Sequence, residues 1–421
     1  MTPVTWLADP SHYPEQMTPL SATTWFEAVG SGLHDAMREL RGEFGGFEAV
    51  TELGWAYEGE LEIEWKPDPE GVRAAALELP RRWEEDLRPR AHEITETLHA
   101  LRPEAPSPVD AVALFDHMWD LVREQWTIHF LAVIPAQIGG ELFYDRYVET
   151  FGDADALAPY RLLQGANESM EADAMLWRLA ELARELDVAD VVVSYPVTAA
   201  LERLRQLRPG RRFLAQLDAY LARFGGRSRW HELSLAREVE HPAMTFEGLR
   251  LFLERGAPQP RQATEVGPDL PSELAELLPV ARAGYDLKES HVYHIDYPGL
   301  LALREVLLGF ARRLTAEGML EDVEDVWMLQ RDEVRNALTS DDDVRILVAG
   351  RRVELAQGLV EGPKVFLGEP PASIERHAAL EKFYGRAGGM AGDVGGRTIR
   401  GTGASPGRGS GPARIVLGPD D

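Results

Sequence analysis

The stretch SPVDAVALFDHMWDLVREQWTIHFLAVIP, residues 107–135, decides the fold class. Its apolar side chains recur every three or four positions, a spacing that places them on one face of an α-helix. Ser107 and Pro108 are residues typical of an N-cap and a first helical position. Pro135 and the pair Gly139-Gly140 predict that the helix ends or kinks there. The apolar face comprises Val112, Phe115, Trp119, Val122, Trp126 and Phe130.

Similar amphipathic patterns on both sides of this stretch predict a mainly α-helical protein with a minor β component. Residues 73–102 have a helical period, with Pro80 and Pro89 as interruptions. Gly318 is a suitable residue to end a long helix. Residues 325–329 (DVWML) read as a short strand. Further helices are expected at 168–186, 197–208, 211–223, 245–255, 272–284, 298–317, 331–338, 341–357 and 372–384.

The two ends of the chain differ from this helical middle. Residues 1–71 form an irregular and β-containing entry segment, in which prolines break the first 30 residues and residues 55–65 alternate as a strand, or as a hairpin around Gly59. Residues 72–384 form the helical region. Residues 385–403 are rich in glycine and read as a linker. Residues 404–421 begin a new module with one strand, at 413–417, which cannot build a core by itself.

Charge and composition exclude several classes of function. The 421 residues include 70 Asp and Glu against 44 Lys and Arg, a formal net charge of −26. Such a field repels nucleic acid and anionic membrane surfaces, so neither is expected as a partner. The chain has no cysteine, which excludes disulfides and thiolate sites and fits a cytoplasmic location. The sequence shows neither a secretory signal nor an apolar run long enough to span a bilayer.

One polar cluster in the sequence suggests catalysis. Glu289, His291, His294 and Asp296 lie within eight residues, and a helix would place the two histidines on one face. A neutral histidine can deprotonate an acceptor hydroxyl while a carboxylate orients its ring. Arg304 follows and could bind a phosphate bidentately. The alternative is that these residues only cap and link two helices.

Two further groups are candidates for substrate binding. Arg227, His231 and Glu232 follow a Gly-Gly pair that would let a ligand approach the backbone, or they are the solvated charges of a turn. Trp119 and Trp126 could line an apolar pocket, although an aromatic stripe at this spacing is usually core.

No metal site is predicted from the sequence. His117, Asp120 and Glu124 have helical spacing but read as a solvated face. His129 lies beside the apolar stripe and reads as a histidine at the edge of the core.

Several motifs together resemble the phosphoenolpyruvate (PEP)-utilising enzymes. Residues 403–416 (GASPGRGSGPARIV) resemble the opening of the swivelling phosphohistidine domain of that family. Residues 297–329 resemble the helical region before that domain, and residues 224–227 (FGGR), followed by His231-Glu232-Leu233, resemble another run of it. Residues 9–25 are similar to the segment that follows the ATP-grasp domain. The resemblance is to the central substrate-binding region of rifampin-phosphotransferase-like and pyruvate,water-dikinase-like proteins.

The resemblance implies a machine of three parts. An ATP-grasp domain phosphorylates a histidine on the swivelling domain, which carries the phosphoryl group to a small-molecule acceptor on the remaining domain. This sequence has no ATP-grasp segment and no histidine after the ASPG run. We therefore expect it to bind the acceptor, with ATP and Mg²⁺ on a missing or partner domain, and to be a fragment or one component of a split enzyme. The alternatives are a stand-alone helical small-molecule-binding protein and a non-catalytic subunit.

Overall fold

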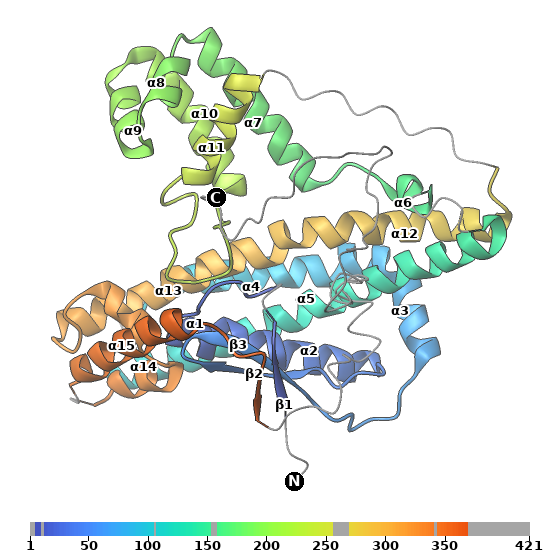
Figure 1. Cartoon of the computed structure of the whole chain (residues 1–421), viewed down its shortest axis with the longest axis horizontal. Coiled ribbons are helices and arrows are strands. Elements are labelled where there is room, and N and C mark those ends of the chain that lie inside the picture. The colour runs from blue at the N-terminus through green and yellow to red at the C-terminus, as the bar shows by residue number, and fades with distance from the viewer. Residues whose placement is uncertain are drawn as a thin grey trace, which may run out of the picture.

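The computed structural model describes residues 5–9, 12–104, 107–152, 158–255, 269–340 and 343–368. Long helices dominate it, and a small antiparallel sheet lies along one side of them (Figure 1). The predicted fold class, mainly α with a minor β component, is confirmed. The helix expected at 372–384, the linker at 385–403 and the strand at 413–417 lie outside the described residues.

The central element is helix α5, Pro108–Phe151, which is 44 residues long. It begins as predicted, with the Ser107 side chain accepting a hydrogen bond from the Asp110 backbone N–H. The predicted end or kink at Pro135 is wrong, because the helix continues for four more turns. Every residue from 128 to 136 is buried, and this packing offsets the roughly 3 kcal/mol that an internal proline costs. None of the described helices is long and apolar enough to cross a membrane.

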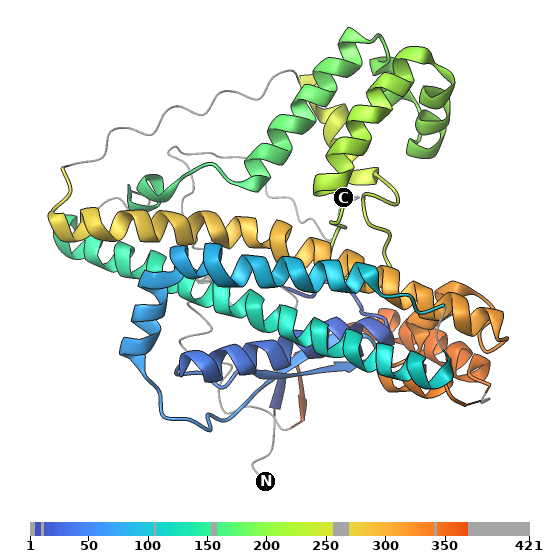
Figure 2. The ribbon, with the colours of Figure 1, turned by 180° about the vertical axis from the view of Figure 1, so that it is seen from behind.

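Helix α12, Ser272–His291, packs along α5, and helix α2, Glu27–Leu40, packs on it from another side (Figure 2). Glycines allow both close approaches. A Cβ on Gly284 would lie 2.9 Å from the carbonyl oxygen of Ala136, and one on Gly32 would lie 2.6 Å from the carbonyl carbon of Trp126. The two helices therefore hold the middle of α5 close to their own backbones.

Two π-helical turns join successive helices without a break, one of them where Pro89 was expected to interrupt the helix. Helices α3 (Pro69–Arg82) and α4 (Arg88–Ala100) are joined without interruption by η2, Trp83–Leu87. Likewise, η3 (Val292–Asp296) joins α12 to α13, Tyr297–Ala316. In each case a proline follows two residues after the turn, at Pro89 and at Pro298. The wider turn makes room for a ring that would otherwise clash with the preceding turn.

The N-terminal segment is more regular than predicted. Helical structure begins at α1 (Pro19–Ser21) and continues through η1 (Ala22–Phe26) into α2, so the irregular reading of the first 30 residues is wrong from residue 19 onward. Thr18 caps the start and Pro19 occupies the first helical position, which is where proline is tolerated.

The sheet has the strand order β2-β3-β1-β4 and is antiparallel throughout. The predicted strand is present but short, and it pairs in a hairpin that turns at Leu53-Gly54, not at Gly59. Leu53 and Gly54 have φ values of +52° and +83°, the left-handed pair that a two-residue turn requires. The strands are β1 (Thr5–Ala8), β2 (Phe47–Glu52), β3 (Trp55–Glu60) and β4 (Phe366–Gly368).

A second helical lobe with its own apolar core stands apart from the long helices in both views (Figures 1 and 2). Its helices α7, α9, α10 and α11 match the predicted ones to within a few residues, whereas α8 was not predicted. The short helix α6, Ala158–Leu163, precedes the lobe in the chain and packs against α5 and α12. The lobe helices are α7 (Glu168–Glu185), α8 (Ala189–Ser194), α9 (Val197–Gln206), α10 (Arg208–Phe224) and α11 (Ala243–Arg255).

The last described elements return to the sheet side of the molecule. Gly318 ends α13 with φ +80°, as predicted. Residues 323–328 form a 3₁₀ helix, η4 (Val323–Met328), so the predicted strand is wrong. The cause is a capping box. The Asp322 side chain accepts from the backbone N–H of Glu324, and the Asp325 side chain accepts from the backbone N–H of Asp322. Helices α14 (Arg331–Ala337) and α15 (Arg345–Glu361) follow.

Candidate functional site

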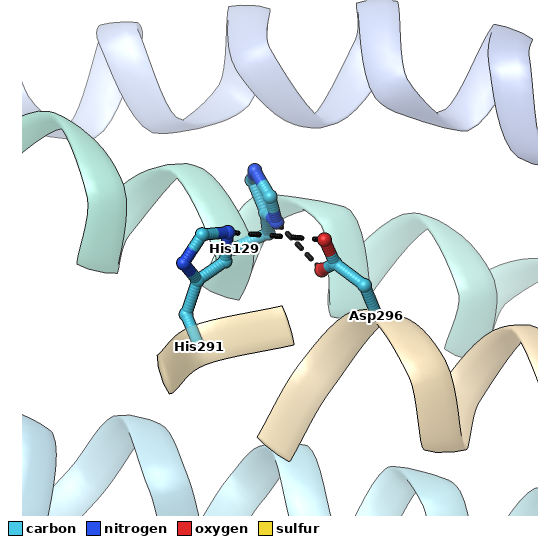
Figure 3. A group of neighbouring side chains, drawn as sticks. All are labelled: His129, His291 and Asp296. Atoms are coloured by element: carbon cyan, nitrogen blue, oxygen red, sulfur yellow. Dashed lines mark hydrogen bonds and ion pairs between the residues drawn. The ribbon is translucent and has the colours of Figure 1, made fainter. Parts of the chain in front are cut away.

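The strongest chemical arrangement in the described residues is a buried carboxylate between two histidines (Figure 3). Asp296 is the last residue of η3, His291 is the last residue of α12, and His129 lies in the middle of α5. Nδ1 of His129 is 2.7 Å from Oδ1 of Asp296, and Nε2 of His291 is 3.8 Å from Oδ2. The first contact is a hydrogen bond and the second is an ion-pair distance.

The elements explain why these three side chains meet. The π turn of η3 changes the direction in which side chains leave the helix just before Pro298, and it brings Asp296 over α5. Close packing of α12 on α5, through Gly284, brings His291 to the same place. The site thus depends on contacts between residues more than 160 positions apart in the sequence.

Burial and charge set the protonation of the group. Burial would raise the pKa of Asp296, but the neighbouring His129 holds it well below its ordinary value by its charge and hydrogen bond. Burial lowers the pKa of His291 to about 4, against the attraction of Asp296. At neutral pH, Asp296 is therefore ionised and His291 is neutral.

The hydrogen bonds also assign the ring nitrogens. Nδ1 of His291 is 3.1 Å from the carbonyl oxygen of Leu287, so in the neutral ring this nitrogen carries the proton and Nε2 is the base. In the neutral form of the His129 ring, Nδ1 donates to Asp296 and Nε2 keeps a lone pair. A carboxylate that fixes one nitrogen of a histidine and stabilises its protonated form is the arrangement that a general base needs.

Aromatic rings enclose the group. The rings of Trp126 and His129 have centroids 4.9 Å apart, and Trp25 stands between Trp126 and His231, with centroids at 6.2 and 5.7 Å. Burial lowers the pKa of His231. A cavity of about 10 Å³ borders Asp296, enough for one water molecule. The carboxylate thus lies in a dry, mostly aromatic environment.

The four residues of the predicted catalytic cluster do not form one site. Only His291 and Asp296 come together. Nε2 of His294 instead lies 2.8 Å from Oε1 of Glu168, and this hydrogen bond lowers the pKa of Glu168 to about 2. The expectation that both histidines share a helix face is wrong, because the π turn adds a residue to the turn between them. Glu289 is exposed on α12 and does not belong to the group.

The second predicted cluster is likewise divided. The carboxylate of Glu232 is buried and accepts hydrogen bonds from the Thr18 backbone and hydroxyl, at 3.1 and 2.8 Å, and from the Ser21 hydroxyl at 2.8 Å. Its role is to hold the start of α1, not to bind a substrate. Arg227 donates to the Tyr220 hydroxyl at 3.0 Å, whereas His231 reaches the edge of the Asp296 group through Trp25.

Of the remaining predicted residues, one contacts the group of His129, His291 and Asp296, and two do not. Trp126 contacts His129, but the guanidinium of Arg331 covers the Trp119 ring at 4.2 Å from its centroid, which places Trp119 away from the group. Arg304 donates from Nε to Glu240 and from Nη1 to the Leu233 carbonyl oxygen, at 2.9 and 2.6 Å.

Sequence reasoning missed His129, which was assigned to the core edge. Nothing in its local spacing reveals that it meets a carboxylate 167 residues away.

The same three residues are the ones in the described part of the chain that could hold a metal ion, since their ligand atoms lie within 4.8 Å of one another. Two imidazoles and one carboxylate suit zinc or another transition metal better than Mg²⁺, which prefers oxygen ligands. A metal would have to replace the existing hydrogen bond between His129 and Asp296. The geometry as it stands therefore favours proton transfer.

Part of the chain is similar to known phosphotransferases. Residues 129–284, which include the second lobe and begin at His129, match the family described as the rifampicin phosphotransferase fourth domain. The chain is 24% identical to an uncharacterized phosphotransferase of Bacillus subtilis (strain 168), YvkC, over 69% of this chain and 37% of that protein. These findings show that part of the chain is similar to phosphotransferases of the PEP-utilising kind.

A second relative covers almost the whole chain. A chondramide synthase of Chondromyces crocatus, cmdD, is 27% identical over 98% of this chain, which corresponds to 12% of that protein. The chain thus spans about an eighth and about a third of the lengths of these two relatives. The activity of the complete proteins is therefore considered only as a proposal for this chain.

Proposed function

We propose that these residues bind the phosphoryl acceptor of a PEP-utilising phosphotransferase and accept the proton of its hydroxyl group. The observation that carries the proposal is the buried Asp296, which fixes the tautomer of His129 by a 2.7 Å hydrogen bond. The family match supports it in part, since residues 129–284, which include His129 but not His291 or Asp296, are similar to a rifampicin phosphotransferase domain.

In the proposed reaction, an acceptor hydroxyl lies against Nε2 of His129. As the hydroxyl oxygen forms a bond to phosphorus, its proton passes to Nε2, and Asp296 stabilises the resulting imidazolium. The bond from phosphorus to the donor breaks in the same step. The aromatic rings of Trp126 and Trp25 exclude water, which would otherwise compete as an acceptor.

The donor is proposed to be a phosphohistidine on a swivelling domain, charged from ATP and Mg²⁺ on an ATP-grasp domain. The described residues of this chain do not suit the binding of ATP and Mg²⁺. Their one candidate ligand group is rich in nitrogen and buried, whereas Mg²⁺ with ATP is held by carboxylate and phosphate oxygens. ATP and Mg²⁺ are therefore assigned to another part of the system.

The test uses the complete gene product that contains these residues. It is incubated with ATP, Mg²⁺ and a panel of hydroxyl-bearing small molecules, and ³¹P NMR follows the appearance of phosphate esters. The proposal expects a new ester resonance with at least one acceptor. ATP consumption that yields only inorganic phosphate and phosphorylated protein, with every acceptor in the panel, would contradict it.

A stand-alone binding protein for a large apolar molecule is the rival function, and it has less support. Its support is the aromatic rings of Trp126 and Trp25 beside the Asp296 group, whereas the family match favours a phosphotransferase. Tight binding of an apolar compound, with no phosphoryl transfer by the complete gene product, would favour this rival.

A further inference from the structure

A second feature of the molecule is a buried arginine whose binding edge is unoccupied by any protein group. Arg237 lies in the segment between α10 and α11 and is 1% exposed. Its Nη1 donates to the Ser228 hydroxyl, but Nε and Nη2 have no hydrogen-bond partner. Nε and Nη2 form the side-on edge of a guanidinium, which binds two oxygens of one anion in parallel.

Leaving this edge unpaired in the interior is costly. A buried donor without an acceptor keeps the cost of its lost hydration, and this cost is larger when the donor is charged. Burial and the nearby charge of Arg304 lower the pKa of Arg237 to about 10, so the side chain is still a cation at neutral pH. The protein therefore keeps a buried positive charge in place without a direct carboxylate partner for it.

The nearby carboxylates already have other partners. Glu240 accepts from Nε of Arg304 and from the backbone N–H of Arg237, at 2.9 and 2.7 Å. Glu232 holds the start of α1, and Glu238 accepts from the backbone N–H of Thr245 at 2.7 Å. Tyr297, whose pKa burial raises to about 12, is neutral. None of these groups supplies an oxygen to the free edge of Arg237.

Other donors nearby also lack acceptors. Among the described residues, seven buried side-chain atoms have no partner, and five of them are N–H donors. Three of the four side chains involved belong to one short segment, whose backbone folds back so that Glu238 N–H donates to the Arg227 carbonyl oxygen at 2.9 Å. The fourth, Trp25, packs against His231 of the same segment. The four side chains are Trp25, Arg227, Trp230 and Arg237.

We propose that Arg237 is the anchor of a binding site for a phosphate-type oxyanion. Nε and Nη2 of Arg237 would each donate to one oxygen of the anion, with the side-chain N–H groups of the same segment as further donors. A tetrahedral phosphate offers several acceptor oxygens, which suits a group of donors better than a planar carboxylate does. The inference stands on unpaired donors and does not require the proposed phosphoryl transfer.

The test measures anion binding to the purified chain without turnover. Inorganic phosphate, sulfate and acetate are titrated at constant ionic strength by calorimetry, and the melting temperature is followed in parallel. We expect saturable binding of phosphate, weaker binding of acetate, and a rise in melting temperature on binding. Stronger binding of acetate than of phosphate, or no saturable binding at all, would overturn the proposal.

Variants separate Arg237 from general charge effects. Arg237→Met keeps the volume of the side chain but removes its donors, and we expect phosphate affinity to fall about tenfold or more. Arg237→Lys keeps the charge but loses the two parallel N–H donors, so its phosphate affinity should lie between those of the wild type and Arg237→Met. Arg250→Gln is the matched control, since Arg250 donates to the Val192 and Tyr195 carbonyl oxygens in the second lobe. Unchanged affinity in Arg237→Met, or equal losses in the control, would contradict the assignment.

A direct reading on the wild-type chain covers the case in which a variant fails to fold. In protein labelled with ¹⁵N at arginine Nε, phosphate should shift the signal of one buried arginine with the same dissociation constant as the calorimetric titration. Calorimetric binding of phosphate with no shift of any arginine Nε signal would overturn the proposal.

Discussion

Arg304 and Arg237 are both almost fully buried, and the charge of Arg304 lowers the pKa of Arg237, yet their environments are opposite. Arg304 donates to Glu240 and to the Leu233 carbonyl oxygen, and it lies over the Trp327 ring at 5.3 Å from its centroid. Arg237 has a single hydroxyl partner and an unpaired edge. Arg304 thus belongs to a structural ion pair, whereas Nε and Nη2 of Arg237 have no hydrogen-bond partner in the protein.

The comparison shows that burial alone does not mark a functional charge. Arg304 is the anion-binding residue expected from the sequence because it follows the His-rich cluster, but its Nε and Nη1 already donate to Glu240 and Leu233. What distinguishes a ligand-binding residue is a polar group whose desolvation is left uncompensated in the folded chain. The same criterion separates Glu232, which is saturated with hydrogen bonds, from the Asp296 group, where two imidazole nitrogens retain free lone pairs.

The largest effect is expected from breaking the paired arginine. Arg304→Met leaves the Glu240 carboxylate and the Leu233 carbonyl oxygen without their partner, and we expect the free energy of unfolding to fall by about 3–5 kcal/mol. Urea unfolding monitored by circular dichroism measures this. A loss below about 1 kcal/mol would mean that Arg304 is not the structural member of the pair.

The next effect concerns pH. The pKa of His291 is lowered from its ordinary value to about 4 in the folded chain, so between pH 6.5 and 4 the unfolded chain binds the proton and the folded chain does not. Stability contributed by the neutral, buried ring is present above pH 6.5 and is lost as the pH falls, by about 3 kcal/mol at most. Asp296, with its lowered pKa, adds a further loss below about pH 4 in the same direction.

Urea unfolding at pH 7 and pH 5 of the wild type and of His291→Gln measures this dependence. The variant should lose less stability over the interval than the wild type does. The exposed ring of His117 supplies the control, because His117→Gln should follow the wild type. Equal slopes for His291→Gln and the wild type would show that His291 is protonated in the folded chain.

The smallest effect on stability is expected at the unpaired arginine. Without phosphate, Arg237→Met should leave the free energy of unfolding unchanged or raise it by about 1 kcal/mol, because removing an uncompensated buried charge relieves a cost. Denaturation in phosphate-free buffer measures it. A loss of several kcal/mol, similar to that of Arg304→Met, would erase the difference between the two residues.

Local periodicity predicted most of the described helices, because the apolar stripes of the long helices face a core, although that of α15 is largely exposed. It failed at Pro135, where burial outweighs the proline, and at residues 323–328, where a capping box favours a 3₁₀ turn. The site was half predicted: His291 and Asp296 were found because they are close in sequence. His129 and Arg237 were not found from the sequence. The contact of His129 with Asp296 forms only in the folded chain, and so does the burial that leaves Arg237 without a partner.

The most direct test of the account is the rate of phosphoryl transfer by the complete gene product with His129→Gln. Glutamine can still donate a hydrogen bond to Asp296 but cannot accept a proton, so the fold is kept while the proposed base is lost. With an acceptor identified by ³¹P NMR, the account predicts a single-turnover rate about 100-fold or more below that of the wild type, with an unchanged circular dichroism spectrum. A rate equal to that of the wild type would contradict the assignment of His129 and Asp296 as the site of proton transfer.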